Sequence, residues 1–130
     1  MTILAIDNLR GGYSEVDILN GIDLSLTEGE ILTVAGTNGA GKSTLAKAAG
    51  GLPPRVTGAV RIDGRDILGL PAEDRIGLGI GYVPQVANIF PSLSILENLQ
   101  VVQGVKDQQA RIAELFALFP LLGERRRTRA

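Results

Sequence analysis

A glycine-rich loop in the first third of the chain has the residue types and spacing of a phosphate-binding site. It matches the pattern G-x-x-x-x-G-K-[ST] in full and reads Gly36-Thr37-Asn38-Gly39-Ala40-Gly41-Lys42-Ser43-Thr44. Glycines let the backbone turn so that successive N–H groups face one anion. The Lys42 ammonium would reach the β- and γ-phosphates, and the Ser43 hydroxyl would bind Mg²⁺. We therefore expect the loop to hold a nucleotide, with Thr44 in reach of the α-phosphate.

A glycine-rich turn can match this pattern by chance, so the segments on either side must show whether the loop is a phosphate-binding loop. Residues 31–35, Ile-Leu-Thr-Val-Ala, are apolar and partly β-branched, as in a strand buried on both faces. Residues 42–49 are mainly helix formers, and the glycines and prolines of residues 50–54 end that helix. A buried strand, a loop and a helix in this order are the context that a phosphate loop requires. Nucleotide binding is therefore the prediction.

The remaining elements indicate an α/β plan. Short strands are predicted at residues 3–9, 18–26, 58–64 and 80–83. Pro71 stands at a predicted first helical position, with acidic residues in the first turn. Ser94 and Glu97 have the spacing of a capping box. Further on, one helical face is formed by Ile112, Leu115, Phe116 and Phe119.

Composition excludes several classes of function. The 130 residues include 13 basic and 14 acidic side chains, for a formal net charge of -1, so a nucleic-acid partner is not expected. There is no Cys and no His, which excludes disulfides, thiolate metal sites and histidine catalysis. The start of the chain lacks the pattern of a signal peptide, and no apolar run is long enough to span a membrane. We expect a cytoplasmic protein.

Several segments, taken together, resemble the ATP-binding subunits of ABC transporters. The phosphate loop is similar to that family's GxNGAGKST form, and residues 82–85, Tyr-Val-Pro-Gln, resemble its Q-loop. Further likeness lies in Tyr13 with residues 18–26, in residues 58–64 and in residues 92–99. Within the family, residues 89–91 and 118–126 look most like branched-chain amino acid importers.

The resemblance implies a fold and a domain plan. The fold is an α/β P-loop NTPase (ABC ATPase) core with an antiparallel β subdomain, truncated in the helical subdomain. Residues 1–130 would be the N-terminal part of one ATPase domain. Residues 1–84 would form the β subdomain and P-loop core, and residues 85–130 the Q-loop and the start of the helical subdomain. The cofactors would be ATP and Mg²⁺.

The resemblance also implies roles for single residues. Tyr13 would stack on the adenine, although an aromatic residue packed in a turn explains it too. Gln85 would act in catalysis with Lys42, as a ligand of Mg²⁺ or of the attacking water, although a polar loop residue after proline is an ordinary occurrence. Ile89, Phe90 and Leu93 would line a groove for a partner helix or would belong to a core. The basic run at residues 125–129 is expected to be a solvated helix end or tail.

Partners and location follow from the same resemblance. A membrane permease subunit and a second ATP-binding subunit would be the partners, on the inner face of the cell membrane. The family's signature motif, its acidic strand and its switch histidine do not occur in these residues. We therefore expect weak nucleotide binding, negligible hydrolysis and an exposed apolar sheet edge. The alternatives are a self-contained P-loop kinase or GTPase, and a nucleotide-binding regulatory module.

Overall fold

The computed structural model describes residues 1–52 and 55–130, in two compact units. The first unit is Met1–Tyr82 and the second is Val83–Ala130. Within the described ranges, none of the helices has the length and apolar character needed to cross a membrane.

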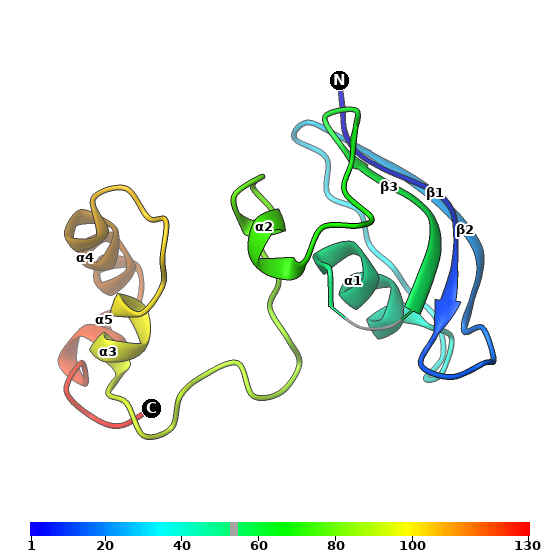
Figure 1. Ribbon diagram of the computed structural model, residues 1–130. Helices are drawn as coiled ribbons and strands as arrows, with labels where there is room; N and C mark the ends of the chain where they lie inside the picture. Colours follow the sequence, from blue (N-terminus) through cyan, green and yellow to red (C-terminus); the bar gives the residue numbers. More distant parts are fainter. Residues whose placement is uncertain (53–54) are drawn as a thin grey trace. The chain divides into compact units, whose positions relative to one another are not determined.

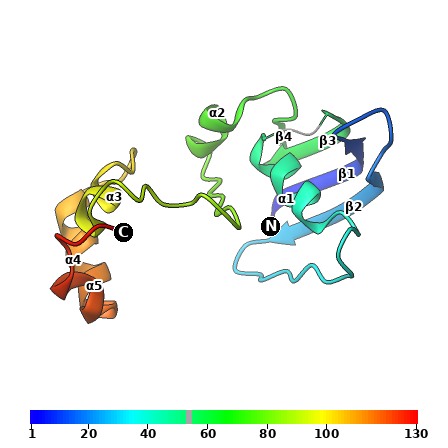
Figure 2. The same cartoon turned by 90° about the horizontal axis from the view of Figure 1, so that it is seen from below.

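The first unit is built on a curved antiparallel sheet (Figures 1 and 2). The central strand β1 (Thr2–Gly12) lies between β2 (Leu19–Thr27) and β3 (Arg55–Ile62), and the two-residue β4 (Arg65–Asp66) extends the sheet beyond β3. Ile6 of β1 faces Leu24 on one side and Val60 on the other. The strands predicted at residues 3–9, 18–26 and 58–64 are therefore confirmed, although β3 begins three residues earlier than expected.

Helix α1 (Lys42–Gly50) covers one face of this sheet (Figure 2). Its Leu45 and Ala48, three residues apart and thus on one helical face, enter the core. The sheet and the segment after it supply the other buried members, which are Ile6, Leu9, Leu19, Val60 and Ile67. Gly51 ends the helix in a left-handed conformation, with φ at 82°. The predicted helix at residues 42–49 is confirmed.

The prediction of a buried strand at residues 31–35 is wrong. This segment is extended but is not assigned to any strand, and Ile31 is 92% exposed. A strand requires a neighbour to bond its backbone N–H and C=O groups, and no described residues provide one here. An apolar hollow of about 410 Å³ lies beside it, lined partly by Leu32, Val34 and Leu45. The strand predicted at residues 80–83 is also not formed, because it too pairs with no other described strand.

Arg75 fastens the next segment to the end of α1. Helix α2 (Ala72–Ile76) carries this residue, which is 2% exposed. Its guanidinium donates to four carbonyl oxygens at 2.9–3.0 Å, those of Ala48, Ala49, Leu68 and Leu70. Burial lowers the pKa of Arg75, and the nearby charge of Asp66 opposes that shift. Pro71 is the residue before the helix, not its first residue as predicted, because its ψ of 164° is extended.

The second unit is helical, with α3 (Ile95–Gln100), α4 (Gln108–Leu118) and α5 (Pro120–Glu124). The capping box is confirmed: Ser94 N donates to Glu97 Oε2 at 2.7 Å, and Glu97 N donates to Ser94 Oγ at 3.1 Å. On α4, Ile112, Leu115 and Phe116 are half-buried as one face, but Phe119 lies beyond the helix and is exposed.

The basic run near the C-terminus is solvated at its side chains but is not a loose tail. Arg125, Arg126, Arg127 and Arg129 are exposed, as expected. Their backbone, however, returns to the start of α3. Ile95 N donates to the Thr128 carbonyl at 2.9 Å, and Leu96 N donates to the Arg126 carbonyl at 2.9 Å. These bonds satisfy N–H groups in the first turn of α3 that have no helical partner.

Candidate functional site

The glycine-rich loop is a tight turn that leads directly into α1. Gly39 and Gly41 have φ angles of 86° and 96°, a left-handed region that glycine adopts without strain. Ala40 N donates to the Thr37 carbonyl at 3.1 Å, which closes the turn. A Cβ atom at Gly41 would lie 3.1 Å from the Ile18 side chain. Glycine at position 41 therefore serves both the backbone conformation and the close approach of the β1–β2 hairpin.

Lys42 folds its side chain back over this loop. Its Nζ donates to the carbonyl oxygens of Gly36 and Thr37, the second at 2.9 Å. The ammonium is therefore directed at the loop and not into solvent. Two carbonyl acceptors leave this three-donor group with a further proton for an anion in the loop.

The N-terminus of α1 is free of any side-chain competitor for an anion. Gly41 occupies the capping position without a side-chain bond, and the first turn contains no acidic residue. The first helical bond runs from Leu45 N to the Gly41 carbonyl at 2.8 Å. The amides before Leu45 therefore point forward without helical acceptors, at the positive end of the helix dipole. This is the arrangement of a phosphate site.

A small pocket of about 200 Å³ lies at this point. It is lined by Ile18, Thr37, Asn38, Gly39, Gly41, Lys42, Ser43 and Thr44. Ser43 is exposed in it and Thr44 is buried. Gly36 and Ala40 do not line the pocket but lie near each other, since a Cβ at Gly36 would be 3.3 Å from that of Ala40. Seven of the nine predicted loop residues therefore line this one pocket, and Gly36 and Ala40 do not.

Tyr13 lies just after β1, beside α1 and not in the core. Its side chain is 54% exposed. The Lys47 ammonium of α1 lies over the ring, 5.6 Å from its centroid, which is within the range of a cation–π contact. One helix therefore carries both Lys42, which reaches the loop, and Lys47, which reaches the predicted base-stacking ring.

Gln85 belongs to the second unit. It lies in a bend with its side chain exposed, and among the described residues its amide makes no hydrogen bond. Ser43, the other residue predicted to bind Mg²⁺, belongs to the first unit. The described ranges contain no group of three or more Asp, Glu, His or Cys side chains placed to hold a metal ion.

The segment Ile89–Phe90–Pro91 is held by a residue that the sequence reading missed. Asn98 of α3 accepts from Phe90 N at 2.7 Å and donates to the Phe90 carbonyl at 3.0 Å. Ile89 and Phe90 are exposed and Leu93 is half-buried, so the first two do not belong to a core. In the sequence, Asn98 is marked only by its position one turn after Ser94. That position does not predict a hydrogen bond to Phe90.

Comparisons with known proteins agree on the family of this chain. The family model described as "ABC transporter" matches residues 19–129. The high-affinity branched-chain amino acid transport ATP-binding protein BraG of Pseudomonas aeruginosa is 33% identical, over 98% of this chain and 56% of its own length. The probable branched-chain amino acid transport ATP-binding protein LivF of Archaeoglobus fulgidus is 38% identical, over 88% of this chain and 50% of its own.

A relative with another named role is equally similar. The lipopolysaccharide export system ATP-binding protein LptB of Haemophilus influenzae is 39% identical, over 82% of this chain and 44% of its own length. The chain spans about half the length of the curated relatives it matches. A solved structure of a nucleotide-free ATP-binding cassette superposes with a TM-score of 0.81 at 23% identity, over all of this chain and 58% of that one. This likeness confirms the predicted fold class, a phosphate-loop core with an antiparallel β subdomain.

Proposed function

We propose, because this chain belongs to the ABC transporter family, that it is part of an ATP-binding subunit that couples ATP binding and hydrolysis to membrane transport. The resemblance to that family noted from the sequence is confirmed by the family match. The observation that carries the proposal is the Lys42 ammonium, folded onto the loop at an uncapped helix N-terminus. A triphosphate would meet the ammonium and the free amides together.

The residues of the loop fit ATP and Mg²⁺ by their chemistry. The Lys42 ammonium would donate hydrogen bonds to the loop carbonyls and to the terminal phosphates. Thr44 would face the α-phosphate. Ser43 would supply a hydroxyl to Mg²⁺, with Gln85 as a second oxygen donor. Bound Mg²⁺ neutralises charge on the phosphates. Tyr13 would stack on the adenine.

The domain plan, partners and location are part of the same proposal. Residues 1–84 would act as the β subdomain and P-loop core, and residues 85–130 as the Q-loop and the start of the helical subdomain. The chain would work with a membrane permease subunit and a second ATP-binding subunit, at the inner face of the cell membrane. The exposed Ile89 and Phe90, held by Asn98, support a contact with the permease.

Branched-chain amino acids are the proposed transport substrate. Support comes from the named roles of two relatives and from the likeness of residues 89–91 and 118–126 to that class. Lipopolysaccharide export is the second candidate, because LptB is as similar in sequence. Co-purification with a permease of each class would decide, and we expect retention by the amino acid permease. Retention only by the lipopolysaccharide permease would reverse the assignment.

Nucleotide titration of the purified chain tests the site itself. We expect Lys42→Ala to weaken ATP binding by about tenfold or more, because a charge-assisted bond to phosphate is lost. Lys106→Ala, at an exposed lysine of the second unit, is the matched control and should bind as the parent does. Unchanged binding by Lys42→Ala would refute the phosphate site. A clear preference for GTP over ATP would favour the GTPase alternative.

A further inference from the structure

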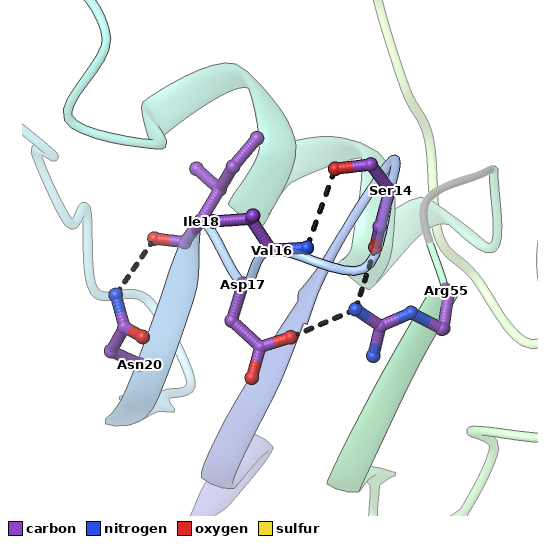
Figure 3. A network of polar contacts seen from close by, with 6 residues as sticks. All are labelled: Ser14, Val16, Asp17, Ile18, Asn20 and Arg55. Atoms are coloured by element: carbon purple, nitrogen blue, oxygen red, sulfur yellow. Dashed lines mark hydrogen bonds and ion pairs between the residues drawn. The ribbon is translucent and has the colours of Figure 1, made fainter.

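A two-armed contact from β3 holds the loop that carries Tyr13 (Figure 3). Arg55, the first residue of β3, donates from Nη2 to the Ser14 carbonyl at 2.8 Å and to Asp17 Oδ1 at 2.9 Å. Ser14 lies within the bend formed by residues 13–16, and Asp17 directly follows that bend. One guanidinium therefore ties two positions of the β1–β2 loop to the start of β3. We refer to these contacts of Arg55 with Ser14 and Asp17 as the loop clamp.

The loop has little else to order it. Its own bonds are local: Val16 N donates to Ser14 Oγ at 3.3 Å, and Ile18 N donates to the Gly11 carbonyl at 2.7 Å. Among the described residues, Arg55 is the one residue outside the β1–β2 hairpin that hydrogen-bonds to residues 13–17. When a ligand orders such a loop, the lost conformational entropy of its side chains and backbone reduces the free energy of binding.

One end of the loop meets helix α1 and the other end meets the phosphate pocket. Tyr13, at one end, has its ring beneath Lys47 of α1. Ile18, at the other end, lines the phosphate pocket and would touch a Cβ at Gly41. Lys42 and Lys47 are five residues apart, or about 7.5 Å along the axis of α1. The position of the loop therefore sets the spacing between the ring and the phosphates.

We propose that Arg55 and Asp17 are positioning residues for the nucleotide base, because their clamp holds the Tyr13 ring where a base attached to loop-bound phosphates can stack on it. The proposal rests on the proposed nucleotide site. Neither residue contacts the phosphate pocket, so the clamp acts on the base and not on the phosphates. Arg55 and Asp17 retain 52% and 35% of their side-chain exposure, and an exposed pair of this kind adds little to stability.

The chain offers a direct optical probe of this ring. It has two tyrosines and no tryptophan, so Tyr13 is the sole fluorophore in a Tyr82→Phe background. In that background we would measure quenching of Tyr13 by acrylamide, and the binding of MgATP and of Mg-tripolyphosphate. Tripolyphosphate has the phosphates without the base, so it reports on the loop alone.

The variants break the clamp from each side. Arg55→Gln and Asp17→Asn should each weaken ATP binding by about threefold to fivefold, leave tripolyphosphate binding unchanged and make Tyr13 easier to quench. Arg55→Lys keeps a charge for Asp17 and should recover part of the ATP affinity. Arg61→Gln is the matched control: it removes an exposed Arg–Asp pair that also starts from β3 but joins β1 at Asp7, away from the loop, and it should change none of these values.

Three results would overturn the proposal. Equal losses for ATP and tripolyphosphate would mean that the clamp supports the whole fold. An unchanged ATP affinity would mean that it positions nothing, and an equal effect from Arg61→Gln would mean that any surface pair suffices. Should Arg55→Gln unfold, Asp17→Asn still gives the ratio of the two affinities. Failure of the nucleotide site itself is recognised separately, because the parent protein would then bind neither ligand.

Discussion

The apolar run at residues 3–6 of β1 and the segment at residues 31–35 are alike in composition but differ in structure. β1 is bonded on both sides, and its Ile6 and Leu9 are essentially buried. Residues 31–35 include Ile, Leu and Val, yet they pair with nothing in the described part of the chain and stay exposed. Local preference for extended backbone is the same in both. The difference teaches that partner strands, and not composition, decide whether such a segment becomes a buried strand.

Truncating one leucine in each region should show the difference in burial between the two regions most clearly. We expect Leu9→Ala to lower the free energy of unfolding by about 3 kcal/mol, because it leaves a cavity in the core. Leu32→Ala, in the extended segment, should change it by less than about 0.5 kcal/mol. Urea denaturation followed by circular dichroism measures both. Equal effects would show that the segment is buried in solution.

The buried guanidinium of Arg75 should have the next largest effect. Arg75→Met removes one donor from each of four carbonyl oxygens, and we expect a loss of about 2 kcal/mol in the free energy of unfolding. Arg61→Gln, at an exposed pair on the sheet, should cost less than about 1 kcal/mol. Thermal melts of the two variants compare them, and a larger loss for Arg61→Gln would contradict the assignment of Arg75.

A charge in the extended segment should change association and not stability. Val34 is exposed, so Val34→Lys should alter the free energy of unfolding by less than about 0.5 kcal/mol and reduce self-association, because a lysine disfavours edge-to-edge pairing. Sedimentation over a concentration series measures this. Val60→Lys, in the buried part of β3, should prevent folding. Unchanged self-association of Val34→Lys would show that molecules do not associate through this segment.

The smallest effect is expected at the turn between β2 and the extended segment. Glu30 accepts from Thr27 N at 2.8 Å and from Thr27 Oγ1 at 2.9 Å, and these bonds lower the pKa of its carboxyl below the ordinary 4.5. The stabilisation is present above pH 4.5 and is lost as the pH falls through the lowered pKa of the folded state. Glu30→Gln should therefore differ from the parent near neutral pH and converge with it in acid. A gap in stability that persists in acid would contradict this.

The phosphate loop and the local signals could be predicted from the sequence, for a shared physical reason. Glycine spacing, the capping box at Ser94 and the glycine after α1 act within a few residues of chain. Alternation in residues 18–26 likewise reflects a strand with one buried face. These patterns depend on backbone sterics and on groups close in the chain, so they can be predicted without knowledge of the tertiary structure.

Contacts between distant positions could not be read in the same way. Arg75 lies 26 and 27 residues from the α1 carbonyls that it bonds, and Arg55 lies 41 and 38 residues from Ser14 and Asp17. Asn98 has the sequence context of an ordinary helical residue, yet its amide bonds both the N–H and the carbonyl of Phe90. Such side chains are common on surfaces, and only their geometry separates a surface charge from a clamp.

Sequence alone was enough to predict the glycine-rich loop, because that loop depends on glycine conformation and on a lysine at a helix start. It also determined the hairpin strands and the helix that follow local rules. Which apolar segments are buried followed only from the tertiary packing, as did the placement of Arg55 against the loop and of Lys47 over the ring of Tyr13. Burial and pairing depend on segments far apart in the chain, and their outcome is settled by the packing that brings them together.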